Sequence, residues 1–170
     1  YLWANYSYGN RVSLGLTFEK DEGEKINFSG NNNGFDFNSF HFQIKDLGVV
    51  SQINIGDFKA GFGQGLCFNS GYRSGKSLIG IGSIDKISSG LQRYTSVEEN
   101  NYLRGVGVVL GIQEFEASFF LSSKYRDATI ITNDEDSILG FSTLISGGLH
   151  NTELALNKKH SLKENSGGIN

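Results

Sequence analysis

Proline and methionine are both absent from this chain of 170 residues. At average usage about 5% of residues would be proline. Glycine and phenylalanine are plentiful by contrast, with 23 and 13 residues. Because a proline interrupts the hydrogen-bond ladder of a strand, its absence suits a protein of long regular strands. The alternative is chance in a short sequence.

Other absences exclude whole classes of protein. The single cysteine, Cys67, cannot form a disulfide within the chain, so cysteine usage does not indicate the redox compartment. A net charge of −3 offers no basic surface for nucleic acid. No run approaches the roughly 18 consecutive apolar residues of a membrane-crossing helix. A nucleic-acid-binding protein and a helical membrane protein are therefore both disfavoured.

Both ends of the chain predict a longer protein. The sequence opens on Tyr1-Leu2-Trp3 without the charged region of a signal peptide. Its last residues, from Ser166 to Asn170, are polar and lack the alternating aromatic strand on which many outer-membrane barrels finish. We expect both ends to be cuts within something larger.

Alternation of apolar and polar residues with a period of two is the dominant pattern, and it predicts β-strands. The clearest strand covers residues 11–19, and residues 1–8 predict its partner through a two-residue hairpin at Gly9-Asn10. The same pattern predicts strands at 25–28, 35–44, 53–68, 106–112, 115–124 and 137–147. Turns are expected at 21–24, 46–48 and 111–114, and a loop at 29–34.

Two of these segments change phase. Phe35 and Phe37 alternate in one phase, whereas the apolar residues from Phe40 onward alternate in the other, which predicts a β-bulge near Asn38-Ser39. Ile53 and Ile55 likewise differ in phase from a run that continues to Phe68. We expect that run to belong to one strand, with its apolar side chains on one face.

The pattern gives about eight strands, several near the roughly 9–11 residues that cross a bilayer. Long connections at about 69–101 and 127–136 contrast with short turns elsewhere, as in bacterial outer-membrane barrels. A soluble sandwich also alternates, but a polar face rich in Gly, Ser and Thr favours a lumen. A short helix capped by Asn151-Thr152 is expected in a loop at about 150–162. We therefore expect an all-β fold, with residues 1–170 part of one antiparallel transmembrane β-barrel domain.

Motifs for chemistry are weak. The segment Gly71 to Ser77 is one residue too short for a phosphate loop, and no helix pattern follows it. Gly61-Phe62-Gly63-Gln64-Gly65 has the wrong spacing for a dinucleotide fingerprint, so its glycines predict close packing instead. The three histidines are scattered, and no metal spacing or nucleophile elbow is present. We predict no enzyme activity, no cofactor and no metal.

Charged residues on strand faces are the remaining candidates for a site. The candidate lumen-lining residues are Asp57, Lys59, Glu116 and Lys124, which share strand faces in pairs. In a lumen they would bias the passage of ions. A structural ion pair or hydrogen-bond ladder is the open alternative.

Several motifs, taken in order, resemble a known family. They are residues 56–66, 71–77, 94–105, 119–124 with 127–128, and 148–154. This order resembles the large outer-membrane β-barrel proteins of Bacteroidota often labelled helix-hairpin-helix domain-containing, over roughly residues 40–170. The labelled domain itself is not in this chain, so no DNA binding is implied, and Asn151 stands where a basic residue is expected. The resemblance implies structural roles for Gly56, Asp57, Gly63, Gln64, Gly65, Gly75, Lys76, Ser77, Arg104, Gly105 and His150.

The sequence therefore predicts an outer-membrane β-barrel protein that is a passive channel or a structural, partner-docking component. Its expected partners are outer-membrane lipid and other outer-membrane or surface proteins, with no nucleic acid. The alternative is a soluble β-sandwich or barrel that binds carbohydrate or cell-surface ligands through its aromatic residues.

Overall fold

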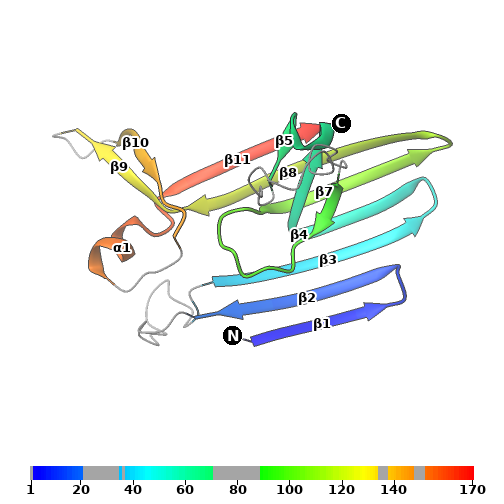
Figure 1. The fold of residues 1–170 in the computed structure, drawn as a ribbon, viewed down its shortest axis with the longest axis horizontal. Coiled ribbons are helices and arrows are strands. Elements are labelled where there is room, and N and C mark those ends of the chain that lie inside the picture. The colour runs from blue at the N-terminus through cyan, green and yellow to red at the C-terminus, as the bar shows by residue number, and fades with distance from the viewer. Residues whose placement is uncertain (1, 21–34, 36, 71–88, 134–137, 148–151) are drawn as a thin grey trace, which may run out of the picture.

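A computed structural model describes residues 2–20, 35, 37–70, 89–133, 138–147 and 152–170. It is mostly antiparallel β-sheet, which confirms the all-β prediction (Figure 1). Its elements are β1 (Leu2–Tyr8), β2 (Val12–Glu19), β3 (Phe37–Leu47), β4 (Val50–Phe62), the 3-10 turn η1 (Gly63–Gly65), β5 (Phe68–Asn69), β6 (Gly90–Arg93), β7 (Leu103–Ile112), β8 (Phe115–Arg126), β9 (Ala128–Thr132), β10 (Ile138–Leu144), α1 (Glu153–Lys158) and β11 (Leu162–Ile169).

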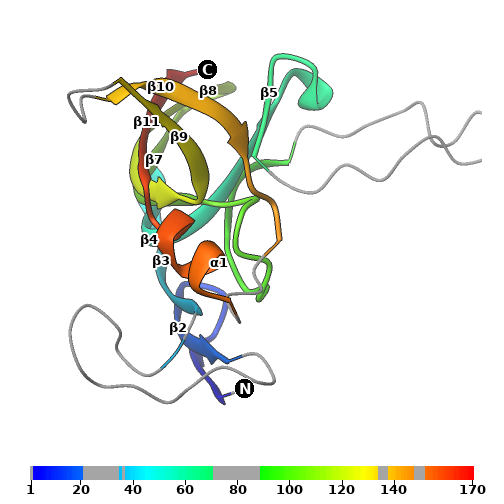
Figure 2. The ribbon, with the colours of Figure 1, turned by 90° about the vertical axis from the view of Figure 1, so that its left-hand side faces the viewer.

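One curved sheet dominates the molecule. Its strand order is β1-β2-β3-β4-β7-β8-β11, and every neighbouring pair is antiparallel. The short strands β5 and β6 pair with β4, and β9 and β10 form a separate hairpin. Seen along its strands, the sheet is an arc whose concave side holds β5 and the chain between β6 and β7 (Figure 2).

The connections differ in length at the two ends of the strands. Three short turns, at residues 9–11, 48–49 and 113–114, lie together at one end (Figure 1). The connections from β2 to β3, from β4 to β7 and from β8 to β11 are all much longer and leave from the opposite strand ends. The predicted asymmetry of the connections is thus confirmed. The first turn has three residues instead of the expected two, because Arg11 also belongs to it and donates its N–H to the carbonyl of Tyr8 at 3.3 Å.

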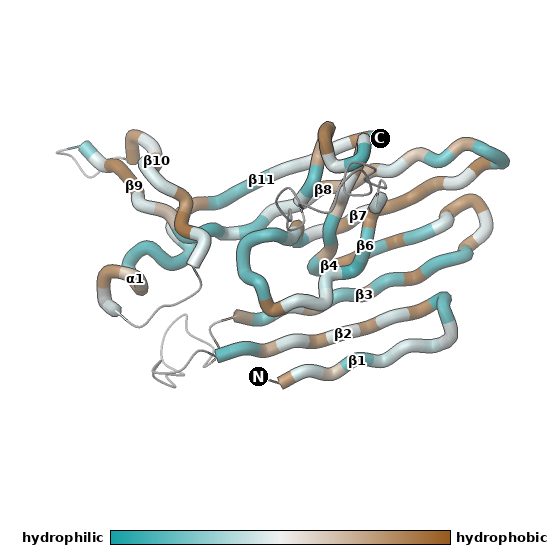
Figure 3. Tube along the Cα trace, in the orientation of Figure 1, coloured by the Kyte–Doolittle hydropathy of each residue, from teal (hydrophilic) through white to brown (hydrophobic). Residues whose placement is uncertain are grey.

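Along much of the main sheet the polar residues are the buried set and the apolar residues the exposed set, although Phe58, Val109 and Phe120 are also buried on the concave side. Hydrophobic and hydrophilic residues alternate along β2, β3, β7 and β8 (Figure 3). The polar set faces the concave side and is buried: Ser13, Thr17, Ser39, His41, Gln43, Asn54, Ser118, Ser122 and Lys124. The apolar set faces outward and is 39–74% exposed: Leu14, Leu16, Phe40, Ile55, Val106, Phe119 and Leu121.

Several expectations from the sequence are wrong. The register between β2 and β3 runs unbroken from Glu19↔Phe37 to Val12↔Ile44, so there is no bulge at Asn38-Ser39. Phe37 is an inward residue that packs against Tyr102, which explains the change of phase.

The expected long strand to Phe68 ends instead at Phe62. Gly63, Gln64 and Gly65 have φ values of +57°, +57° and +73°, which reverse the chain, and β5 then pairs back on β4. The sequence also does not predict β6, β9 and β11, since it favours loops at about 69–101 and 127–136 and no strand after residue 160.

Other local predictions are confirmed. The helix α1 begins after Thr152, whose hydroxyl accepts the N–H of Ala155 at 3.2 Å. The strand predicted at 137–147 corresponds to β10, and the turn predicted at 111–114 joins β7 to β8. The turn, strand and loop predicted within 21–34 lie outside the described residues.

Candidate functional site

The candidate site lies on the concave face, where a long segment of the chain folds inward. This inserted segment comprises residues 57–62 of β4, β5, β6 and residues 94–102. It departs from β3 at Gly56, which has a φ of +90° and where a Cβ would overlap the carbonyl oxygen of Phe40. The conformation therefore requires glycine at this position.

An apolar cluster fixes the first half of the inserted segment to the sheet. Phe120, which points inward from β8, is 6.3 Å from the Phe58 ring, 6.1 Å from Phe62 and 5.1 Å from Phe68. Buried residues from β4, β6, β7 and β8 complete the cluster: Phe58, Ala60, Phe62, Leu91, Leu103, Val109 and Phe120. The concave side thus has its own small hydrophobic core.

A bidentate ion pair ties three strands together beside this core. Arg104 of β7 donates from Nε to Oδ1 of Asp57 at 2.7 Å and from Nη2 to Oδ2 at 2.8 Å. The same Nη2 donates to the carbonyl of Asn38 at 2.6 Å, and Oδ2 accepts the backbone N–H of Phe40 at 3.2 Å. Asp57 is fully buried, so its carboxylate depends on these partners. The pair replaces the strand ladder at the point where β4 leaves β3.

Lys124 holds the second half of the inserted segment. Its ammonium group donates to the carbonyl oxygens of Asn100 at 2.5 Å and Tyr102 at 2.7 Å, and it lies 4.4 Å from the centre of the Tyr102 ring. The side chain is only 4% exposed. Charge-assisted hydrogen bonds are about twice as strong as neutral ones, so Lys124 is an anchor and not a free charge facing solvent.

The inserted residues also stack on one another. The Tyr102 ring is 5.1 Å from Tyr94 and 5.8 Å from Phe37, and Lys59 lies 5.0 Å above the Tyr94 ring. Burial raises the pKa of Tyr102 to about 12, with a smaller opposing effect from Arg104. Burial raises the pKa of Tyr94 further still. Both tyrosines are therefore neutral at any physiological pH.

The turn between the two tyrosines is braced by its own acid. The Glu98 carboxylate accepts the N–H of Asn100 at 2.9 Å and of Asn101 at 2.8 Å, and the Tyr94 hydroxyl donates to the Glu98 carbonyl. The side chain of Asn100 reaches the carbonyl of Ser146 at 2.9 Å. The segment is thus tied to both the sheet and the connection that follows β10.

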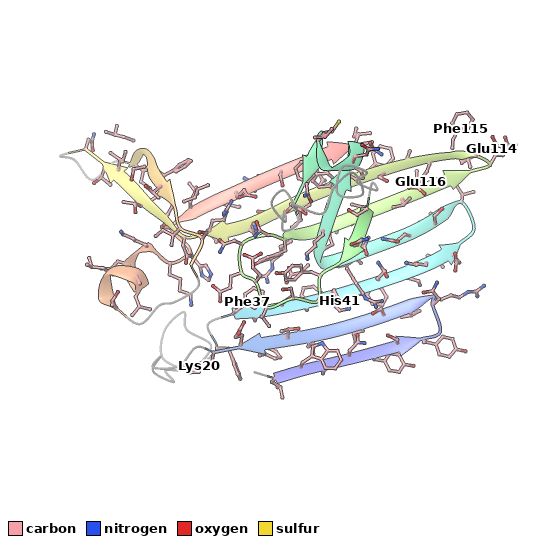
Figure 4. The ribbon with its side chains drawn as sticks, viewed as in Figure 1. Lys20, Phe37, His41, Glu114, Phe115 and Glu116 are labelled. Carbon is pink, nitrogen blue, oxygen red and sulfur yellow. The ribbon has the colours of Figure 1, made fainter. Side chains whose placement is uncertain are left out.

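Polar side chains of the sheet form a hydrogen-bonded floor next to this segment. Gln43 donates to Asn54 at 2.8 Å, and Nε2 of His41 lies 3.3 Å from the hydroxyl of Ser13. The His41 ring, labelled in Figure 4, lies over Gly15, where a Cβ would overlap it. The floor is therefore a network of polar side chains that hydrogen-bond to one another.

The four candidate lumen-lining residues lie in two different places. Asp57 and Lys59 belong to the inserted segment, and Lys124 contacts it from β8. Asp57 pairs with Arg104 and not with Lys59. Glu116 lies exposed beside the turn between β7 and β8, together with Glu114 and Phe115 (Figure 4). The role of all four in a lumen stays a prediction.

The residues to which the family resemblance gives structural roles also lie in different places. Gly56, Asp57, Arg104 and Gly105 meet at the ion pair, where β4 and β7 are in register. Gly63, Gln64 and Gly65 form η1. Gly75, Lys76, Ser77 and His150 lie outside the described residues.

Sequence reasoning missed three members of the site. Tyr94 and Tyr102 lie within one of the family-like motifs but carry no chemical signature of their own, and the three histidines, including His41, are scattered along the chain. The one available signal was the pair of tyrosines that flank the acidic turn at Glu98. Within the described ranges, no three histidine, cysteine or acidic side chains are close enough to hold a metal ion.

Comparisons with known proteins gave no match. No protein-family model, no curated protein and no solved structure matches the chain. The resemblance to Bacteroidota outer-membrane barrels therefore stays a prediction. No helix in the part of the chain that the structure describes has the length and apolarity to cross a membrane.

Proposed function

We propose that the chain is part of an outer-membrane β-barrel, in which it acts as a structural or partner-docking component. The observation that carries this proposal is the inverted sheet, with a buried polar concave face and an exposed apolar outer face. Water penalises that arrangement by roughly 25 cal/mol for each Å² of exposed apolar surface. Lipid removes the penalty, and a polar lumen accommodates the other face.

Strand length and connection length support the same proposal. The strands β3, β7 and β8 have 11, 10 and 12 residues, which suits a tilted crossing of a bilayer. Short turns at one end and long connections at the other are typical of bacterial barrels.

Aromatic residues support it as well. Tyr6 and Tyr8 are exposed beside the short turns, and Tyr125 is exposed at the opposite end of β8. Aromatic residues at both edges of an apolar band are expected where barrel walls meet the two membrane surfaces. In a soluble binding module, exposed aromatic residues would gather on the concave face. The concave tyrosines, Tyr94 and Tyr102, are instead buried.

The inserted segment favours docking over free passage. Its apolar cluster, the Asp57–Arg104 pair and the Lys124 anchor hold it across the concave face. A lumen filled in this way resembles the plugged barrels more than the open porins. Passive transport is the second candidate, because the polar floor of the sheet would line whatever space the segment leaves.

Purification of the protein in the form its gene encodes tests the membrane proposal. We expect it to require detergent for solubility and to shift in gel mobility on heating, as barrels do when they unfold. A monomer that is soluble without detergent and shows no heat-dependent shift would refute the proposal.

Planar-bilayer recordings then separate the two functions. The docking role predicts no channel steps, whereas regular steps would favour passive transport.

A further inference from the structure

The two edges of the main sheet run in the same direction. β1 runs from the end with the long connections toward the short turns, and β11 does so as well (Figure 1). This follows from the topology: the path from β1 to β11 has seven strands, and each is antiparallel to its neighbours. The first and the last strand of such a path must be parallel.

The free edge of β11 carries backbone groups in need of partners. Ser118 and Asn170 exchange two backbone hydrogen bonds, of 2.8 and 2.9 Å. Since hydrogen-bonded pairs alternate in an antiparallel ladder, the N–H groups of Lys163, Asn165 and Gly167 point away from β8. Among the described residues no strand lies beside this edge. In a bilayer each unsatisfied backbone group costs several kcal/mol.

We infer that the barrel wall is completed by an odd number of further antiparallel strands, which lie between β11 and β1. The inference rests on the proposed function, because only a membrane wall must close. Antiparallel closure requires an even total, and the seven strands of the main path leave an odd remainder.

Two simpler closures are excluded by direction. Direct pairing of β11 with β1 would make a parallel ladder in an otherwise antiparallel wall. A ring of two copies with their long connections on the same side would pair β11 of one copy with β1 of the other, which is parallel again. An inverted second copy would place its long connections on the opposite side of the membrane.

Hydrogen exchange tests whether the edge is paired in the protein as its gene encodes it, folded in detergent micelles. We expect the amides of Lys163, Asn165 and Gly167 to exchange at least roughly 100-fold more slowly than in an unstructured peptide. Exchange at the unstructured rate would overturn the inference. The amide of Ser166, which bonds to β8, is the internal control.

Cross-linking tests the direction argument in a Cys67→Ser background. The test variant combines Ala4→Cys with Asn165→Cys, and the control combines Ser123→Cys with Asn165→Cys, which are register partners. Oxidation is expected to form a disulfide in the control pair and not in the test pair, because a disulfide requires Cα atoms within about 7 Å and even one intervening strand would hold the test pair farther apart. A link between Ala4→Cys and Asn165→Cys would overturn the inference, within one chain as direct closure and between chains as a two-copy ring. Failure of the proposed function would appear differently, as solubility without detergent.

Discussion

The outer face of β8 permits a test in which water and lipid predict opposite results. Leu121 and Phe115 lie on the same strand and point the same way, and their exposed fractions are 74% and 81%. Leu121 lies near the middle of β8. Phe115, which stands between Glu114 and Glu116, adjoins the turn that joins β7 to β8. In lipid, an arginine at mid-membrane costs about 2–4 kcal/mol, and near the interface about 0–1 kcal/mol.

We therefore expect Leu121→Arg to lower the free energy of unfolding by about 2–4 kcal/mol, with Phe115→Arg as the matched control at about 0–1 kcal/mol. The first loss corresponds to a roughly 30- to 700-fold smaller folding equilibrium constant. The assay is urea-driven unfolding from lipid vesicles, followed by the heat-dependent gel shift. In a soluble sheet both substitutions at exposed positions would stay within about 0.5 kcal/mol. Equal effects of the two variants would refute the reasoning.

Three further predictions concern the inserted segment. Arg104→Met leaves the buried Asp57 carboxylate without its main partner, so the free energy of unfolding measured in urea should fall by about 3 kcal/mol. A variant as stable as the parent would contradict a structural role for the pair. Gly56→Ala should cost roughly 2 kcal/mol because of its positive φ and the overlap with a neighbouring carbonyl, whereas Gly140→Ala, with open space around it, should change little. Tyr102 is neutral in the fold and its pKa is raised to about 12, so its contribution to stability is complete below a pH of about 10 and is lost as the pH rises through 12. The increase in tyrosinate absorbance with pH should show this late ionisation. A Tyr102→Phe variant with the same absorbance increase above pH 11 would show that another tyrosine is responsible.

The two-faced strands could be predicted from sequence, but their orientation could not. Period-two alternation is the same whether the apolar or the polar set faces the interior. In β2 the alternation of Leu14 and Leu16 with Ser13 and Thr17 fits a soluble sandwich as well as a membrane wall. Only the curvature of the sheet, with the polar set on its concave side, distinguishes the two.

The errors follow from residues whose role depends on distant partners. Phe37 breaks the alternation because it packs on Tyr102, far along the chain, and in the sequence this change of face has the same pattern as a bulge. β11 has few apolar residues and two adjacent glycines, so its pattern is weak, and its pairing with β8 defines it as a strand. The Asp57–Arg104 pair joins residues 47 positions apart, which no local spacing predicts.

The most direct test of the account is the accessibility of spin labels along β8 in lipid vesicles. Labels at Phe119 and Leu121 should collide often with dissolved oxygen and rarely with a water-soluble nickel complex, because these positions face the acyl chains. Labels at Ser118 and Ser122 should show the lower oxygen accessibility of the concave face. Frequent collisions of the nickel complex at Phe119 and Leu121 would show that the apolar face is in water and would contradict the account.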